Sequence, residues 1–101
     1  MSGQRLMVGA ASVLSLAPHI VFRFDDTRSR WIIMAPERLM LPDEQAVEIL
    51  QLVDGTAGVG EIIDSLARRY TQAPRVLIAK DVIAMLQDLA DKGCLVDAGP
   101  H

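Results

Sequence analysis

The order of hydrophobic patterns along the chain limits its possible folds more than any other feature. Residues 20–25 alternate, so that Ile20, Phe22 and Phe24 share one face of a predicted strand. A polar, turn-prone segment follows over residues 26–29, and the apolar run at residues 31–34 predicts a second, more buried strand. Three segments with helical spacing fill most of the remaining sequence. A β-hairpin followed by helices predicts an α+β domain.

Proline residues bound a third, shorter strand. Pro36 lacks the N–H that a sheet ladder needs, so the second strand is expected to stop at the Ala35-Pro36 step. Residues 37–41 are long enough for a short strand, which Pro42 closes. The three strands together predict a small antiparallel sheet.

Three helices are predicted after this sheet. Asp43 is placed to cap the first helix, and the step Asp54-Gly55 is expected to end it. The second, over residues 59–70, has the most regular amphipathic spacing. The third runs from about residue 74 to residue 92, and its apolar side chains cover about half of the helix circumference. Contact with one small core needs less, so part of this helix is expected to face a groove.

The two ends of the chain carry weaker patterns. Residues 6–17 are small and apolar, but the single Arg5 before them and Pro18 after them do not suit a secretion signal. We expect residues 1–17 to form a loose N-terminal arm and residues 18–97 to form the domain. Residues 95–96 are expected to pack back as a short tail. No run reaches the roughly 20 apolar residues of a membrane span, so no membrane partner is expected.

The reactive residues do not form a catalytic pattern. The single cysteine, Cys94, excludes an internal disulfide and a cysteine-built metal site, and His19 and His101 stand at opposite ends of the sequence. No glycine-rich phosphate loop and no motif around a serine nucleophile occurs. At 101 residues the chain has the size of one domain. We therefore expect a cytoplasmic protein that is not an enzyme and holds neither a metal nor a cofactor.

Two binding functions are compatible with these elements. The second and third helices with the hairpin as a wing would form a helix-turn-helix domain that binds DNA. The third helix, however, carries Asp81, Asp88 and Asp91, and aspartates repel the phosphate backbone, so no nucleic-acid partner is expected. The alternative is a self-associating module, a homodimer formed through the open edge strand or by strand exchange.

A distinctive series of residues runs through positions 18–96. It comprises Pro18, Arg23-Phe24-Asp25, Arg28, Trp31, Ala35-Pro36-Glu37-Arg38, Ile49-Leu50, Asp54-Gly55, Ile62, Leu66, Tyr70, Asp81-Val82, Leu86, Leu89 and Gly93. The series resembles the coenzyme pyrroloquinoline quinone (PQQ) synthesis protein D family. Two features depart from the family pattern: Cys94 stands where the family more often has an aliphatic residue, and residues 1–17 lie outside the resemblance.

The resemblance implies a winged-helix-like fold, a three-stranded antiparallel sheet followed by a three-helix bundle. Members of this family are precursor-peptide recognition elements. The implied function is that of a non-catalytic peptide chaperone, which binds the ribosomally made PQQ precursor peptide and presents it to a radical S-adenosylmethionine (SAM) enzyme. That enzyme, and not this chain, would carry out the chemistry.

The resemblance also implies where the peptide binds, because in such elements it adds as a strand to the third strand and packs against the third helix. The implied peptide-binding residues are Arg38, Leu39, Met40 and Leu41 on the strand, and Ile78, Val82, Met85 and Leu89 on the helix. Trp31, Pro36 and Glu37 are expected to support the third strand, with Trp31 buried by the hairpin. The basic strand face with Arg23, Arg28 and Arg30 is a candidate surface for contact with the enzyme.

Overall fold

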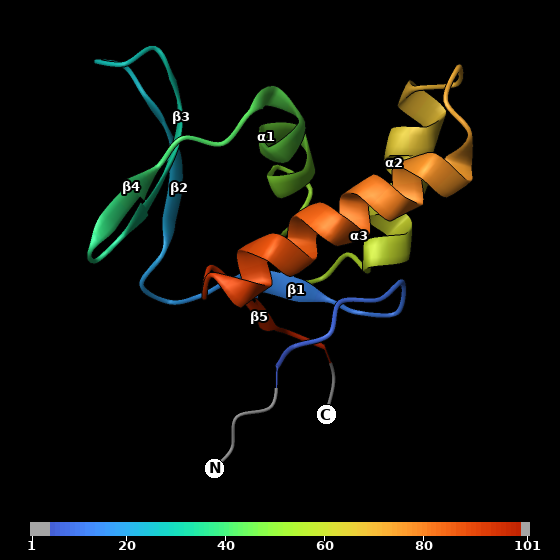
Figure 1. The fold of residues 1–101 in the computed structure, drawn as a ribbon, viewed down its shortest axis with the longest axis horizontal. Helices are drawn as coiled ribbons and strands as arrows, with labels where there is room; N and C mark the ends of the chain where they lie inside the picture. The colour runs from blue at the N-terminus through green and yellow to red at the C-terminus, as the bar shows by residue number, and fades with distance from the viewer. Residues whose placement is uncertain (1–4, 100–101) are drawn as a thin grey trace.

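The computed structural model describes residues 5–99 of the chain (Figure 1). Its elements, in chain order, are β1 (Leu14–Leu16), β2 (Val21–Asp25), β3 (Arg30–Ala35), β4 (Arg38–Met40), α1 (Glu44–Leu50), α2 (Val59–Arg69), α3 (Arg75–Asp91) and β5 (Leu95–Asp97). Strands β2, β3 and β4 form one antiparallel sheet in that order. The predicted α+β class, with a three-stranded sheet followed by three helices, is confirmed. A second, two-stranded antiparallel sheet joins β1 to β5.

Two turns set the register of the three-stranded sheet. The β2–β3 hairpin pairs Phe24 with Trp31, and its four-residue turn ends at Ser29, whose φ of 53° lies in the left-handed region. Pro36 and Glu37 form the two-residue turn between β3 and β4, which pairs Ala35 with Arg38. The turn segments and the strand break at Pro36 therefore lie where the sequence predicts them.

The first helix begins as predicted and ends earlier. The Asp43 carboxylate accepts a hydrogen bond from the N–H of Ala46 at 2.8 Å, as an N-cap does. The prediction that this helix continues to Asp54-Gly55 is wrong, because its hydrogen bonds tighten to i→i+3 spacing after Leu50. The Asp54 carboxylate instead accepts the N–H groups of Thr56 and Ala57, and so shapes the loop before α2.

The hydrophobic core is built mainly by the three helices and the β1–β5 sheet. Its buried members are Val8, Leu14, Ala17, Ile20, Ile33, Ile49, Leu50, Val59, Ile62, Ile63, Leu66, Val82, Leu86, Leu89, Cys94 and Leu95. Of strands β2 to β4, only Ile33 contributes a buried side chain to this cluster. The three-stranded sheet thus stands beside the core rather than inside it (Figure 1).

The prediction of a loose N-terminal arm is wrong for residues 5–17, while residues 1–4 lie outside the described part of the chain. Leu14 and Ala17 are buried, and β1 pairs along its whole length with β5. The carbonyl oxygens of Ala10 and Ser12 accept the N–H groups of Gly60 and Val59 at 2.9 and 2.8 Å. Because the first amides of a helix have no partner within it, this segment satisfies the N-terminus of α2.

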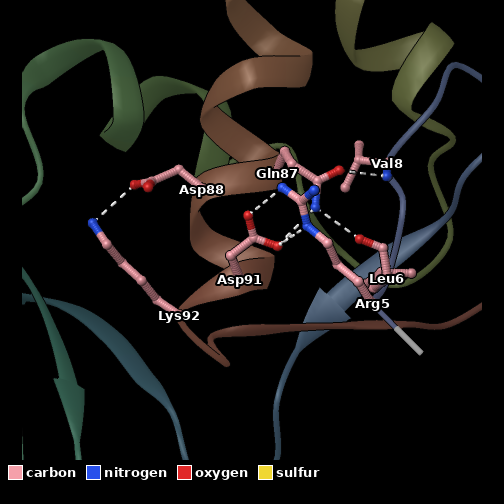
Figure 2. A network of polar contacts seen from close by, with 7 residues as sticks. All are labelled: Arg5, Leu6, Val8, Gln87, Asp88, Asp91 and Lys92. Carbon is pink, nitrogen blue, oxygen red and sulfur yellow. Dashed lines mark hydrogen bonds and ion pairs between the residues drawn. The ribbon is translucent and has the colours of Figure 1, made fainter. Parts of the chain in front are cut away.

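A polar network fastens the same segment to α3 (Figure 2). The Gln87 side chain accepts the N–H of Val8 at 2.9 Å and donates to the C=O of Leu6 at 2.7 Å. Arg5 forms a two-point ion pair with Asp91, at 2.7 and 2.6 Å. The Arg5 hydrogen bond lowers the pKa of the Asp91 carboxyl from its ordinary value, so this group is charged at neutral pH. The N-terminal segment is therefore an integral part of the fold.

Candidate functional site

Strand β4 has one open edge within the described chain. It is the last strand of the order β2-β3-β4 and pairs with β3 alone. Ala35 and Arg38 close the hydrogen-bonded turn at residues 36–37 and form a hydrogen-bonded pair. Hydrogen-bonded and non-hydrogen-bonded pairs alternate along an antiparallel ladder, so the next pair, Met34 with Leu39, is not hydrogen-bonded. The intervening residue, Leu39, therefore directs its N–H and C=O away from β3, toward the open edge.

An apolar groove of about 280 Å³ lies between β4 and the C-terminal half of α3. Met40 comes from β4, and Met85 and Leu89 come from α3. The full lining consists of Ile33, Met40, Leu41, Pro42, Asp43, Ala46, Met85, Asp88, Leu89 and Lys92. Asp88 and Lys92 form an ion pair at 2.9 Å, also drawn in Figure 2, so the remaining charge of the lining is the carboxylate of Asp43.

The structure brings together four of the eight residues predicted to bind peptide: Met40, Leu41, Met85 and Leu89 all line the groove. Met40 and Met85 are half-buried, and Leu41 is half exposed. Flexible thioether side chains suit a surface that adapts to a guest chain.

The other four residues lie outside the groove lining. Val82 is 1% exposed and belongs to the core. Ile78 lies two helical turns from Met85, nearer the N-terminal end of α3. Leu39 alternates with Met40 along β4, so it lies on the opposite face of the sheet, where its side chain is exposed. Arg38 donates a hydrogen bond to the C=O of Lys92 at 3.2 Å, which ties β4 to the end of α3.

The β3–β4 turn end of β4 adjoins a second hollow, of about 510 Å³. Arg38 and Lys92 give it a basic character, and Pro36 and Glu37 form part of its wall. Nearby Cys94 is buried, and burial raises the pKa of its thiol. Cys94 therefore serves as a protonated, apolar side chain in the core.

Trp31 is half-buried, whereas the sequence predicts a tryptophan buried by the hairpin. Its ring stacks on Phe22 with centroids 4.7 Å apart and meets Phe24 edge-on at 6.0 Å. The difference arises because the helix-facing side of the hairpin tip opens onto a hollow of about 850 Å³ rather than onto the core. Pro36 and Glu37 form the two-residue turn between β3 and β4.

Sequence reasoning missed this hollow. Its lining comes from three separated segments: Phe24, Arg28, Ser29, Arg30 and Trp31; Pro42, Asp43, Glu44, Val47, Glu48 and Gln51; and Arg69 with Tyr70. The one signal in the sequence was the density of aromatic and arginine residues around the hairpin turn.

Over residues 5–99 no group of three or more potential ligands could hold a metal ion. None of the helices in the same range is long and apolar enough to cross a bilayer.

A comparison with protein-family models decides the family. The model described as coenzyme PQQ synthesis protein D (PqqD) matches residues 30–95. This span runs from β3 to the start of β5 and contains the whole groove. The chain belongs to the PqqD family. The resemblance seen in the sequence is thereby confirmed.

Relatives and a solved structure agree with membership of the PqqD family. A "PqqA binding protein" of Rhodopseudomonas palustris (strain BisB5) is 55% identical over 98 residues, which are 97% of this chain and 95% of the relative. The "Bifunctional coenzyme PQQ synthesis protein C/D" of Methylorubrum extorquens is 40% identical over 73 residues, 72% of this chain and 19% of that protein.

The solved structure is a solution NMR structure of the PqqD truncation of Methylobacterium extorquens PqqCD. It is described as a functional and stand-alone recognition element for a ribosomally synthesized and post-translationally modified peptide. It superposes with a TM-score of 0.72 at 35% identity, covering 88% of this chain and 94% of that one. The α+β architecture is thus shared with a PqqD domain.

Proposed function

We propose that this chain is a non-catalytic peptide chaperone of PQQ biosynthesis, which binds the precursor peptide as an added strand on β4. The observation that carries the proposal is the open β4 edge beside the apolar groove. An extended peptide satisfies the main-chain groups of such an edge, and its alternate side chains enter the groove. A relative that is 55% identical over nearly the whole chain is named for binding PqqA, which supports the same ligand here.

The affinity is expected to come from edge hydrogen bonds together with apolar burial. Each main-chain bond contributes about 0.5–1.5 kcal/mol net, and apolar area contributes about 25 cal/mol per Å² removed from water. Arg38 is exposed, and an exposed ion pair with a peptide carboxylate would add less than about 1 kcal/mol. Met40 and Met85 are therefore expected to matter more than Arg38.

We propose that the loaded peptide is presented to a radical SAM enzyme. The names of the relatives, PqqA binding protein and recognition element, fit a binding role rather than a catalytic one. A PqqD domain occurs fused to another PQQ synthesis protein in Methylorubrum extorquens, which supports contact with pathway enzymes. A ribosomally made peptide is first available in the cytoplasm, where we place the encounter. A second copy of this chain pairing at β4 would occupy the same edge, so dimer formation is expected to compete with peptide.

The groove is tested by placing a charge in it. Met85→Asp should weaken binding of the synthetic precursor peptide about tenfold or more in a calorimetric titration, because the carboxylate must lose water on peptide binding. Val76→Asp is the matched control, since Val76 lies on the same helix and is 72% exposed. Circular dichroism checks that both variants fold. If Met85→Asp does not fold, Met85→Gln is used in its place. Equal affinity of a folded Met85 variant and the wild type would contradict binding in this groove.

A further inference from the structure

The hollow of about 850 Å³ is larger than the groove and has no part in the account of strand addition. It lies between the tip of the β2–β3 hairpin and α1, both near the top of Figure 1. Arg69 and Tyr70, at the end of α2, also line it. Three aromatic residues line it: Phe24 is 45% exposed, Tyr70 is 47% exposed, and Trp31 is half-buried. Tryptophan, tyrosine and arginine dominate the binding energy of protein interfaces, so this composition suits a recognition surface.

The polar residues of one wall are held in place by each other. The Tyr70 hydroxyl donates to the Glu48 carboxylate at 2.7 Å, and Arg69 pairs with the same carboxylate. Burial alone would raise the pKa of Glu48, but the hydrogen bonds from Tyr70 and Arg69 outweigh it, and this pKa lies below its ordinary value. The Tyr70 ring is therefore anchored by a charged partner while half of its surface stays open.

Of the three arginines that line the hollow, Arg30 is the one without an ion-pair partner in the described chain. Arg28 pairs with Asp25 at 2.7 Å and Arg69 pairs with Glu48, whereas no carboxylate of the described chain lies within ion-pair distance of Arg30. Arg30 donates instead to the C=O of Pro42 at 3.1 Å. A guanidinium has five N–H donors, so Arg30 keeps donors for a carboxylate that comes from outside.

The hollow and the groove are separate cavities that adjoin at one short segment. Pro42 and Asp43 line both of them, on either side of the connection from β4 to α1. A chain that pairs with β4 and continues past Leu41 would therefore cross this connection and enter the hollow. An extended chain advances about 3.3–3.6 Å per residue, so a few residues suffice to bridge the two.

We propose that the aromatic hollow is a second subsite for the same precursor peptide. It would take the segment that adjoins the β4-paired strand, with an apolar or aromatic side chain packed on Phe24, Trp31 and Tyr70 and a nearby carboxylate on Arg30. The inference rests on the proposed function, because it extends a peptide already held at β4. The protein would thus hold the peptide at two places and fix the direction in which it leaves the groove.

Trp31 provides a reporter that is specific for this subsite, since it is the only tryptophan in the chain. Protein labelled with 5-fluorotryptophan gives one fluorine resonance, which is recorded during titration with unlabelled synthetic precursor peptide. In parallel, ¹⁵N amide shifts of β4 and α3 report on the groove. The full-length peptide should shift both sets of signals. A peptide shortened to the β4-paired segment should shift the amides alone.

Variants separate the two subsites. Phe24→Ala and Arg30→Gln should each raise the Kd of the full-length peptide about three- to tenfold and leave the Kd of the shortened peptide unchanged. Leu77→Ala is the matched control for Phe24→Ala, because Leu77 is 52% exposed on α3 and lines neither hollow. Arg23→Gln is the control for Arg30→Gln on the same hairpin.

The outcomes distinguish this inference from the proposed function. Amide shifts in β4 and α3 without a fluorine shift would overturn the second subsite and leave strand addition intact. A fluorine shift that appears only when the radical SAM enzyme is added would assign the hollow to the enzyme and overturn the inference equally. No shift of any kind with the precursor peptide would overturn both.

Discussion

The helical half and the three-stranded sheet of this protein are built in different ways. In the helical half, together with β1 and β5, side chains such as Leu86 and Val59 are completely buried. On the outer face of the sheet, Val21, Met34 and Leu39 lie opposite one another on three neighbouring strands, and each is at least 40% exposed. The first region removes nearly all of its large apolar side chains from water. The sheet buries Ile32 and Ile33 but leaves much of its other apolar surface accessible.

This difference indicates that the residues that stabilise this small domain and the residues that bind a partner lie in different parts of it. A chain of about 100 residues buries only about two-thirds of its unfolded surface, so it cannot bury all of its elements equally well. Here the helices and the β1–β5 pair form the core, and the sheet offers an edge, a groove and an aromatic hollow. Substitutions of core side chains should therefore reduce stability, and those at the β4 edge, the groove and the hollow should reduce binding.

The largest effect on stability is expected at Leu86. Leu86→Ala removes a side chain that is 0% exposed at the centre of the core, and such truncations cost about 2–5 kcal/mol. Urea unfolding followed by circular dichroism measures the loss. Leu77→Ala, on the exposed side of the same helix, should change the free energy of unfolding by less than about 0.5 kcal/mol. Similar losses for both would mean that α3 is not packed as described.

An intermediate effect is expected where the N-terminal segment meets α3. Gln87→Ala removes the two hydrogen bonds to the backbone of Leu6 and Val8 (Figure 2), which should cost about 1–2 kcal/mol. Hydrogen exchange should also become faster at residues 6–8. Gln45→Ala is the control, because Gln45 is exposed on α1. If exchange at residues 6–8 stays the same, the Gln87 hydrogen bonds do not hold this segment in place.

The smallest effect on stability is expected at the sheet edge. Leu39→Pro removes an N–H that points away from β3, so the free energy of unfolding should fall by no more than about 1 kcal/mol. Binding of the precursor peptide should nevertheless weaken about tenfold, because an edge donor is lost. Leu39→Ala keeps the donor and serves as the control in the same calorimetric titration. Tight binding by Leu39→Pro would show that the peptide does not pair at this position.

Local patterns predicted the elements whose signals lie within a few residues. The Asp43 cap, the turn at Pro36 and the regular spacing of α2 all formed where expected. The β1–β5 sheet was not predicted, because Leu14–Leu16 and Leu95–Asp97 are each too short to show an alternation and lie at opposite ends of the chain. Their pairing depends on the folded core that brings both ends together.

The site was predictable only in part, because local patterns are visible in the sequence and contacts between distant segments are not. The wide apolar arc of α3 indicated that this helix serves both a core and a groove, but periodicity does not say which residue faces which. Val82 lies in the core and Met85 lines the groove, although they are one turn apart. The aromatic hollow was missed because the hairpin, α1 and the end of α2 meet only in the tertiary structure.

Hydrogen exchange at the Leu39 amide, with and without the precursor peptide, tests strand addition most directly. In the free protein this N–H faces the open edge of β4 and should exchange with solvent at nearly the rate of an unprotected amide. A bound peptide strand should accept a hydrogen bond from it and slow its exchange markedly, while the Arg38 amide, already bonded in the turn, should change far less. Unchanged exchange at Leu39 in the saturated complex would contradict strand addition at β4.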